Sequence, residues 1–287
     1  MNEHIPVMLH EALDGLALRS DGLYWDGTFG RGGHTSAILE RLGEQGRVIG
    51  SDRDTAAAET AAGLTDTRFS FRRGSLEDVM VQMETGLAGL LWDLGCSTPQ
   101  LKDPSRGFSF SENGPLDMRM DQSQEQSAAT LVNETPEKEL ADLIFLYGEE
   151  RFSRRIASRI VTARQQEPIL DTHTLAEICK TVYPKRHYHR IHPATRTFQA
   201  LRIAVNDELG QLERNLAKAL ALLAENGRAV IISFHSLEDR IVKHTFRGLA
   251  KEGSYEVITK RPLVPGDDEV KRNPASRSAK MRIIERI

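Results

Sequence analysis

Short apolar segments alternate with helical patterns through residues 23–94, and this alternation most limits what the chain can fold into. Apolar runs at 23–25, 47–51, 69–71 and 87–94 have the length of strands. The segments 35–42, 56–64 and 76–83 between them are typical of helices. Strands and helices that alternate at this spacing form right-handed βαβ units on a parallel sheet. We therefore expect an α/β fold with a doubly wound sheet.

The alternation stops between about residues 102 and 206 and then resumes. Segment 103–126 is typical of a long loop, and helices are expected to begin at Thr135, to cover 149–164 and to run from His192 to Asn206. We then expect a helix at 209–224 ended by Asn226 and Gly227, a helix at 237–249, and strands at 228–233, 255–259 and 281–287. This order predicts a discontinuous cofactor-binding domain, 1–102 with 207–287, and an inserted helical substrate-recognition domain, 103–206.

Composition excludes several classes of protein. No stretch approaches the roughly 18 uninterrupted apolar residues that a membrane span needs, so we expect no membrane partner. The first residues lack the basic and apolar regions of a secretion signal. Two cysteines, Cys96 and Cys179, are too few for a disulfide framework or a four-cysteine zinc site. These features favour a cytoplasmic protein.

The formal net charge of -3 conceals an uneven distribution along the chain. Residues 151–206 carry 11 Lys and Arg against 3 Asp and Glu, a net charge of +8, whereas 103–150 have a net charge of -8 and 1–102 a net charge of -6. Such asymmetry indicates a polyanionic partner for the basic region, or mutual neutralisation between the acidic and basic stretches.

The loop 26–34 joins the first expected strand to its helix and contains four glycines. Glycine lets a backbone turn sharply and approach a ligand at the carboxyl edge of a sheet. The spacing differs from the dinucleotide fingerprint because Phe29 stands where the second glycine would be. Asp26 at the strand end suits a cofactor with an amine and a sulfonium better than one with phosphates. The alternative is a tight turn without a ligand.

Two more acidic residues come at expected strand ends. Asp52 has the spacing of an acid that accepts hydrogen bonds from adenosine ribose hydroxyls, while Asp54 could take that role or cap the next helix. Asp93 precedes Ser97, Thr98 and Pro99, and this segment could receive hydrogen bonds from the amino group of a base. The alternative for it is a strand end followed by a capping turn.

Together with further runs downstream, these segments resemble the ribosomal RNA small-subunit methyltransferase H family, which methylates the exocyclic amine of a cytosine. The resemblance extends nearly from end to end. The runs that carry it are His4 with 6–11, 26–34, 52–54, 93–100, 106–110, 114–120, 147–151, 192–200, 233–240 and 273–274.

The resemblance implies a Rossmann-like methyltransferase sheet with an inserted all-helical domain, and S-adenosylmethionine as cofactor. It implies direct in-line methyl transfer to N4 of a cytidine in small-subunit (16S) ribosomal RNA, with the RNA expected within an assembled particle. Leu76 departs from the family pattern, in which an aromatic residue is expected. Asp93 is also the candidate catalytic residue, with its carboxylate and the carbonyls of the 97–99 turn accepting the amine hydrogens. The implied cofactor-binding residues are Gly32, Gly33, His34, Asp52, Leu76, Asp93 and Gln100.

The segment 178–206 contains no acidic residue and interleaves basic with aromatic side chains, a pattern typical of RNA binding. Arg154, Arg155 and Arg159 could extend the same face. Arg196 and Gln199 could line a cleft or bind across the domain junction. The three histidines of this segment lack an adjacent cysteine or carboxylate, so we expect no metal site. The candidate RNA-binding residues are Lys185, Arg186, Tyr188, Arg190, His192 and Arg196.

Other functions remain open at this point. A nicotinamide-dependent dehydrogenase could use the same architecture, and a ribosome-assembly factor could keep the cofactor loop without activity. Cys96 lies beside the expected pocket, where a carbon-5 methyltransferase would have its nucleophile. No basic residue adjoins it in the sequence, so we interpret it as a small residue in a turn. His235 and Asp239 are interpreted as a helix start and a possible cleft wall.

Overall fold

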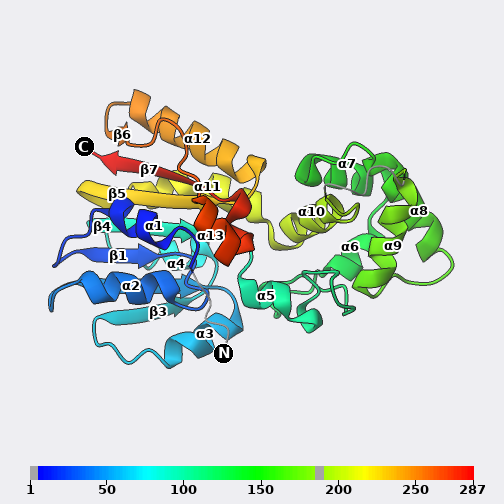
Figure 1. The fold of residues 1–287 in the computed structure, drawn as a ribbon, viewed down its shortest axis with the longest axis horizontal. Helices are drawn as coiled ribbons and strands as arrows, with labels where there is room; N and C mark the ends of the chain where they lie inside the picture. The colour runs from blue at the N-terminus through cyan, green and yellow to red at the C-terminus, as the bar shows by residue number, and fades with distance from the viewer. Residues whose placement is uncertain (1–5, 185–190) are drawn as a thin grey trace. The chain divides into compact units, whose positions relative to one another are not determined.

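A seven-stranded sheet is built from the first and last parts of the chain in the computed structural model, which describes residues 6–184 and 191–287 (Figure 1). Its order is β3-β2-β1-β4-β5-β7-β6, and β1 to β5 are parallel. This confirms the expected α/β fold. The strands are β1 (Leu23–Asp26), β2 (Arg47–Asp52), β3 (Phe69–Arg73), β4 (Leu87–Asp93), β5 (Leu223–Ser233), β6 (Tyr255–Val257) and β7 (Lys280–Arg286).

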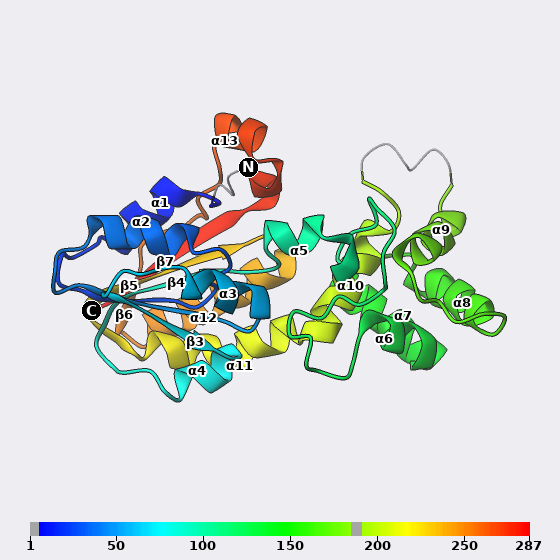
Figure 2. The same ribbon diagram turned by 90° about the horizontal axis from the view of Figure 1, so that it is seen from below.

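Helices cover both faces of this sheet (Figures 1 and 2). On one face, α1 (Leu9–Leu16) and α2 (Gly33–Arg41) pack against a row of buried residues that includes Tyr24 and Val230. On the other face, α4 (Leu76–Met80), α11 (Glu208–Leu220) and α12 (Ser236–Lys251) pack against Trp25 and Ile231. Neighbouring residues of one strand thus enter opposite cores, as the alternation of side chains in a strand requires.

The end of the sheet departs from the parallel pattern. β7 lies between β5 and β6 and is antiparallel to both. The helix expected at 209–224 ends earlier, at Leu220, and Asn226 and Gly227 fall within β5 rather than at a helix end. Pairing of β4 with β5 shifts register there, and a Cβ on Gly227 would lie 2.7 Å from the Leu87 carbonyl oxygen. The glycine therefore permits a close approach of two strands.

Helices and loops make up the central part of the chain. α7 (Glu137–Gly148), α8 (Ser153–Arg164) and α10 (Thr195–Asn206) correspond to the expected helices, whereas α6 (Ala128–Glu134) and α9 (Thr172–Val182) were not predicted. Their buried face centres on Ile144, Ile156 and Leu201. The remaining elements of the chain are α3 (Thr55–Ala62), α5 (Thr98–Lys102), the 3-10 turns Pro104–Arg106 and Pro274–Ser278, and α13 (Asp267–Arg272).

The chain divides into two compact units. The sheet unit comprises Met1–Gly95 and Leu209–Ile287, and the helical unit comprises Cys96–Glu208. Each has its own hydrophobic core. The assignment of cofactor binding to one part and substrate recognition to the other stays a prediction. No helix among the described residues has the length and apolar character needed to cross a membrane.

Candidate functional site

The carboxyl edge of the sheet brings three acidic side chains to adjacent strand ends. β1 lies between β2 and β4, and the order of strands along the chain reverses between β1 and β4. Ligands of open α/β sheets bind at such a switch point. Asp26 ends β1, Asp52 ends β2 and Asp93 ends β4, as the sequence predicted.

The glycine loop after β1 is held against the neighbouring strands. The Gly27 amide donates to the Leu91 carbonyl oxygen at 2.9 Å, and the Gly30 amide donates to Asp52 Oδ2 at 2.9 Å. A Cβ on Gly27 would lie 2.1 Å from Trp92 Nε1, which no side chain could accommodate. Gly32 has a φ of +73° just before α2, a conformation that glycine adopts without strain. The loop therefore needs glycine at these positions for backbone reasons.

Asp26 is a buried carboxyl group at the start of this loop. Its Oδ2 accepts a hydrogen bond from Thr35 Oγ1 at 2.7 Å, and its Oδ1 accepts one from the Thr28 amide at 3.2 Å. Burial raises the pKa of Asp26 to about 6, against the opposing effect of the Thr35 hydrogen bond. The pKa is raised a little further by the charge of Asp52.

Asp52 holds two loops together through its carboxylate. Oδ2 accepts from the Gly30 amide and Oδ1 from the Asp54 amide, each at 2.9 Å. Burial raises the pKa of Asp52 above its usual value. Asp54 takes the capping role that the sequence left open, because its side chain accepts from the Ala56 amide at the start of α3.

Asp93 has the most unusual environment of the three. Its Oδ1 atom is buried and has no hydrogen-bond partner among the described residues. Burial, followed by the negative charges of Asp26, Glu238 and Glu269, raises the pKa of Asp93 well above its usual range. A buried carboxyl oxygen without a partner is costly, so this arrangement favours a ligand that brings a hydrogen-bond donor or a positive charge.

Sequence reasoning did not place Glu238 and Glu269 near Asp93. Both come from elements far along the chain, at the start of α12 and in α13. The Glu269 carboxylate accepts from the Met8 amide at 2.7 Å, and Glu238 accepts from the Phe234 amide at 2.9 Å. The run 233–240 contained Glu238, but only the strand order brings that run to the edge where Asp93 lies.

Three other predicted cofactor residues, Leu76, His34 and Gly33, lie in the sheet unit. Leu76 begins α4, and its Cδ2 atom would be 3.2 Å from a Cβ on Gly27, so it lies beside the glycine loop. The His34 ring is buried, and its Nε2 is 3.1 Å from the Val7 carbonyl oxygen. The His34 imidazole therefore ties α2 to the segment before α1. Gly33 also contacts that segment, because a Cβ there would meet Pro6 at 2.4 Å.

Gln100 belongs to the helical unit, where it completes a helix cap. Ser97 is the N-cap of α5, the Ser97 amide donates to Gln100 Oε1 at 2.7 Å, and the Gln100 amide bonds back to Ser97 Oγ. The turn at 97–99 is therefore a capping turn.

Cys96 has a basic neighbour that the sequence did not reveal. Arg202 Nη1 donates to Cys96 Sγ at 3.3 Å, and the same guanidinium forms an ion pair with Glu208 at 2.9 Å. No basic residue adjoins Cys96 along the sequence, but the fold brings Arg202 of α10 to it. Burial nevertheless raises the pKa of the Cys96 thiol, which disfavours a nucleophilic thiolate.

The predicted RNA-binding residues are only partly described. Lys185, Arg186, Tyr188 and Arg190, like His187 and His189, lie outside the described residues. The ring of the exposed His192 lies tilted against Phe110, with ring centres 4.5 Å apart.

Arg196 and Gln199 secure the end of α7. Arg196 Nη1 donates to the Glu149 carbonyl oxygen at 2.8 Å, and Gln199 Nε2 donates to the Tyr147 carbonyl oxygen at 3.0 Å. These contacts lie within the helical unit. Arg196 is half-buried and a guanidinium has five donors, so this contact leaves others for a substrate.

His235 and Asp239 occupy the first turn of α12. His235 is its N-cap, as the sequence suggested. Asp239 pairs with Arg282 of β7 at 2.7 Å and with Lys280 at 3.6 Å, which fastens α12 to the sheet.

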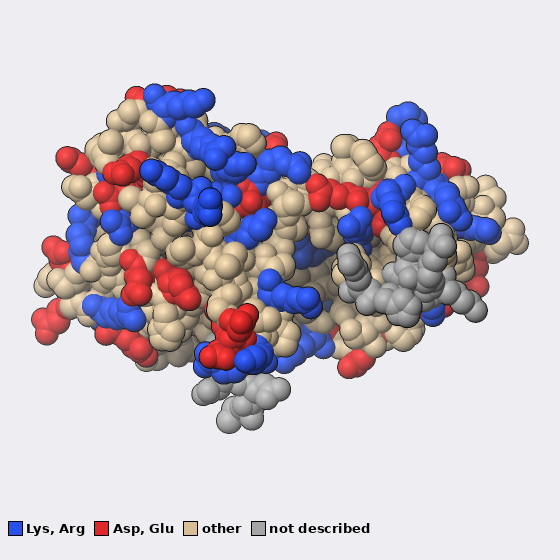
Figure 3. Space-filling view, turned by 45° about the horizontal axis from the view of Figure 1, so that its top comes forward, with Lys and Arg blue, Asp and Glu red and all other residues tan. Residues whose placement is uncertain are grey.

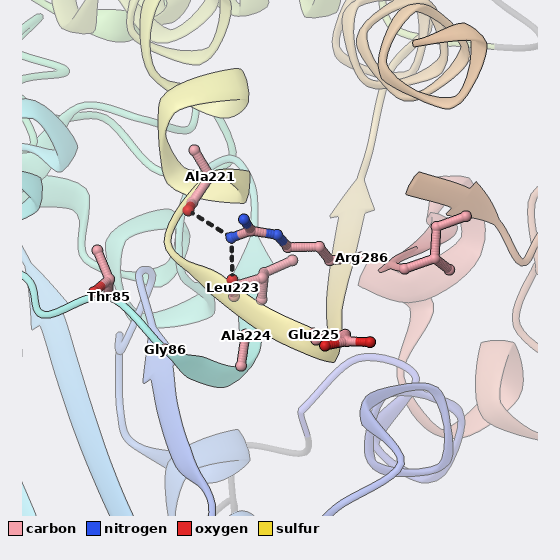
Figure 4. Close-up of a pocket in the computed structure, with 8 residues that line it drawn as sticks. Thr85, Gly86, Ala221, Leu223, Ala224, Glu225 and Arg286 are labelled. Carbon is pink, nitrogen blue, oxygen red and sulfur yellow. Dashed lines mark hydrogen bonds between the residues drawn. The ribbon is translucent and has the colours of Figure 1, made fainter. Parts of the chain in front are cut away.

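A shallow depression lies at the opposite, amino edge of the sheet (Figure 4). One guanidinium nitrogen of Arg286 donates to the carbonyl oxygens of Ala221 and Leu223, at 3.1 and 2.5 Å. Arg286 thus joins the end of β7 to the turn before β5. These contacts give Arg286 a structural role. We assign no functional role to the depression.

Comparison with known proteins agrees with the geometry. The family model described as the MraW methylase family matches residues 1–287. The ribosomal RNA small subunit methyltransferase H of Neorickettsia sennetsu is 48% identical over 99% of this chain and 96% of its own length. The protein of the same name from Methylococcus capsulatus is 48% identical over 97% of this chain and 99% of its own. Among solved structures, a candidate rRNA methylase from Clostridium thermocellum has a TM-score of 0.48 at 14% identity, covering 99% of this chain and 100% of that one.

Proposed function

The chain belongs to the MraW methylase family and is a methyltransferase, and we propose that it methylates the exocyclic N4 amine of a cytidine in small-subunit (16S) ribosomal RNA. The full-length relatives named ribosomal RNA small subunit methyltransferase H support the ribosomal RNA substrate. The cytidine and its N4 amine follow from the resemblance of the sequence runs. The observation within the fold that carries the proposal is the unpartnered, buried Asp93 Oδ1 at the switch point of the sheet.

The residues at the carboxyl edge fit S-adenosylmethionine as cofactor. That molecule supplies an electrophilic methyl group on a sulfonium, and the reaction is a direct in-line transfer to the amine. The edge carries the carboxyl groups of Asp26, Asp52 and Asp93, whose pKa values burial raises, and a cation bound beside them would favour their ionised form. The glycine loop allows close approach of the backbone, with Gly32 and Gly33 at the start of α2. Asp52 would accept from ribose hydroxyls with the lone pairs that its two amide contacts leave free.

We assign to Asp93 the role of holding the target amine of the cytosine. The amine lone pair is delocalised into the cytosine ring, so the site must hold the nitrogen in a reactive geometry. The Asp93 Oδ1 atom, which lacks a partner, accepts an amine hydrogen and favours a pyramidal nitrogen. The proton leaves during or after transfer, so a strong general base is not required. The target cytidine must be unpaired or extruded, because its amine is otherwise engaged in base pairing.

The direct test is the substitution Asp93→Asn assayed on undermethylated small-subunit particles. We expect turnover to fall on the order of 10²-fold, the usual effect of removing one group that stabilises a transition state. Asp21→Asn is the matched control, because Asp21 is exposed just before β1 at the opposite edge of the sheet. Full turnover of the Asp93 variant with unchanged cofactor affinity would remove Asp93 from this role.

Two measurements separate the proposal from the other functions. Calorimetry with S-adenosylhomocysteine and with NAD tests the cofactor, and binding of NAD alone would favour a dehydrogenase. Mass spectrometry of nucleosides from RNA treated with labelled cofactor tests the product. We expect N4-methylcytidine; label on carbon 5 would instead implicate the Cys96 thiol, and no label in RNA would favour an assembly factor.

The remaining assignments belong to the same proposal. We propose an assembled small-subunit particle as the substrate, a cytoplasmic location, and contact of the RNA with the helical unit through His192, Arg196 and the segment 185–190. Comparing protein-free rRNA with particles in the same assay tests the first of these. Efficient methylation of protein-free RNA alone would contradict it.

A further inference from the structure

Helix α8 presents an arginine-rich face to solvent. Its other face is fully buried, with Ile156, Ala157 and Ile160 in the core of the helical unit. Figure 3 shows Lys and Arg side chains gathered along part of the surface of this unit. We define the α8 arginine face as four exposed residues: Arg151, in the turn before α8, and Arg154, Arg155 and Arg159 on the helix.

The charges of the α8 arginine face are unbalanced within the described residues. None of the four guanidinium groups forms an ion pair there, although other basic residues of the same unit do. Lys138 pairs with Asp142, Lys180 with Glu177 and Arg119 with Asp117. The segment 151–166 contains no acidic residue at all. The α8 arginine face thus gathers four cations without a carboxylate partner among the described residues.

This arrangement works against the stability of the helix. Arg155 and Arg159 are four residues apart on α8, so like charges lie next to one another there, and Arg151 adds a third positive charge from the turn just before the helix. Arg154 and Arg155 also lie in the first turn, where the helix macrodipole favours negative charge. At the other end of α8, Arg164 is a basic residue in the last turn, where the macrodipole favours positive charge. Its guanidinium also donates to the carbonyl oxygens of Val132 and Thr135. A polyanion bound along the face would relieve the repulsion.

An aromatic residue orders two of the guanidinium groups. The guanidinium carbons of Arg151 and Arg155 lie 4.7 and 5.5 Å from the centre of the Phe152 ring. Phe152 is itself fixed by an edge-on contact with Tyr183, with ring centres 4.8 Å apart. Fixing long side chains in advance lowers the entropy cost of binding. Residues four apart on a helix are separated by about 6 Å along its axis, so Arg155 and Arg159 can contact neighbouring phosphates.

We propose that the α8 arginine face binds the phosphate backbone of the ribosomal RNA substrate, as an anchor that is independent of base sequence. The proposal rests on the proposed RNA methyltransferase function and extends it to a second contact with the substrate. Arginine suits this role because its planar guanidinium can donate two parallel hydrogen bonds to one phosphate. Phosphate contacts set the position and affinity of a nucleic acid without reading its sequence.

The test is the triple substitution Arg151→Gln, Arg155→Gln and Arg159→Gln in the full chain. Binding of a protein-free rRNA fragment and methylation of particles are measured between about 50 and 200 mM salt, where phosphate contacts have their largest effect. We expect the slope of log affinity against log salt to become shallower by about 2, since each single-strand phosphate contact contributes about 0.7. We expect KM to rise at least about tenfold while kcat and S-adenosylhomocysteine affinity stay unchanged, because a uniform binding contact is lost.

Two further variants identify the cause. Replacing the same three arginines by lysine keeps the charge and should retain most of the salt slope. Replacing Lys218, Arg247 and Lys251 by glutamine removes the same charge from exposed positions of the sheet unit and should leave the slope within error.

An unchanged slope and KM in the α8 triple variant overturns the proposal while leaving the methyltransferase assignment intact. An equal effect in the sheet-unit variant overturns it as well, because the contact would then be general electrostatic attraction. A KM effect on particles without any effect on protein-free RNA points to a ribosomal protein instead and also overturns it. Failure of the wild-type protein to label any RNA is a different result, and it contradicts the proposed function itself.

Discussion

At the residue scale, the burial of Asp26 makes stability depend on pH. The pKa is about 6 in the folded protein against an ordinary value of 3.8, so the folded state binds this proton more tightly than the unfolded state does. The stabilising contribution is therefore complete below pH 4 and is lost as pH rises through about 6. Over the whole range the loss is about 3 kcal/mol, at about 1.4 kcal/mol for each pKa unit.

Asp26→Asn should remove this dependence. Between pH 5 and pH 7.5 the contribution of Asp26 falls by about 1.4 kcal/mol, so the substitution should flatten the fall in unfolding free energy by that amount. Urea unfolding at the two pH values measures it, with Asp21→Asn as the exposed control. If the Asn variant lost stability with pH as steeply as the wild type, Asp26 would not be the group responsible.

Cofactor binding should release protons near pH 6, where Asp26 titrates. The raised pKa values of Asp26, Asp52 and Asp93 fall when a cation binds beside them, because positive charge stabilises the carboxylate form. S-adenosylmethionine should therefore release more protons than S-adenosylhomocysteine, which lacks the sulfonium charge. Calorimetry in two buffers of different ionisation enthalpy counts the protons, and equal release for the two ligands would contradict the placement of the sulfonium near these groups.

At the scale of elements, we predict that replacing glycine by alanine at two positions has opposite effects on the free energy of unfolding. Gly27→Ala would force its Cβ to within 2.1 Å of Trp92 Nε1, so we expect a loss of about 1–3 kcal/mol in unfolding free energy and weaker cofactor binding. Gly248→Ala is the matched control, since Gly248 lies inside α12 with no atom within 4 Å of the new Cβ. There we expect a gain of about 0.5–1 kcal/mol from helix propensity. Two changes of the same sign in thermal or urea unfolding would contradict this interpretation of the loop.

The elements that could be predicted from the sequence are those whose position follows from the local pattern of apolar, glycine and acidic residues. β1, β2 and β4 with their terminal aspartates were predicted because buried strands and acidic strand ends are local features. The prediction that Asn226 and Gly227 end a helix was wrong, because the same dipeptide can end a helix or lie in a bulged strand. Only the packing of Gly227 against β4 decides between them. The antiparallel β7 and the proximity of Glu238 and Glu269 to Asp93 depend on long-range pairing, which a local pattern does not contain.

At the scale of the whole molecule, the two units should respond to different ligands. The glycine loop, Asp52 and Asp93 belong to the sheet unit, and the α8 arginine face belongs to the helical unit. In hydrogen exchange of the full chain, S-adenosylhomocysteine should protect 26–34 and 52–54, and an rRNA fragment should protect 151–160. At a ligand concentration of about 100 times Kd, protection should correspond to about 2.7 kcal/mol. Protection of 151–160 by the cofactor analogue alone would contradict this division of roles.

The interruption of the sheet by the helical unit also determines when the sheet can be completed during synthesis. β4 pairs with β5, but residues 94–222 must be translated between them, which takes on the order of ten seconds at about 5–20 residues per second. Until then β4 is an open strand edge whose backbone N–H and C=O groups have no partner on one side. β7 pairs on both sides, with β5 and β6, and is the last strand to be made. A nascent chain therefore carries an unfinished sheet for most of its synthesis, and this period is when we expect it to depend most on chaperones.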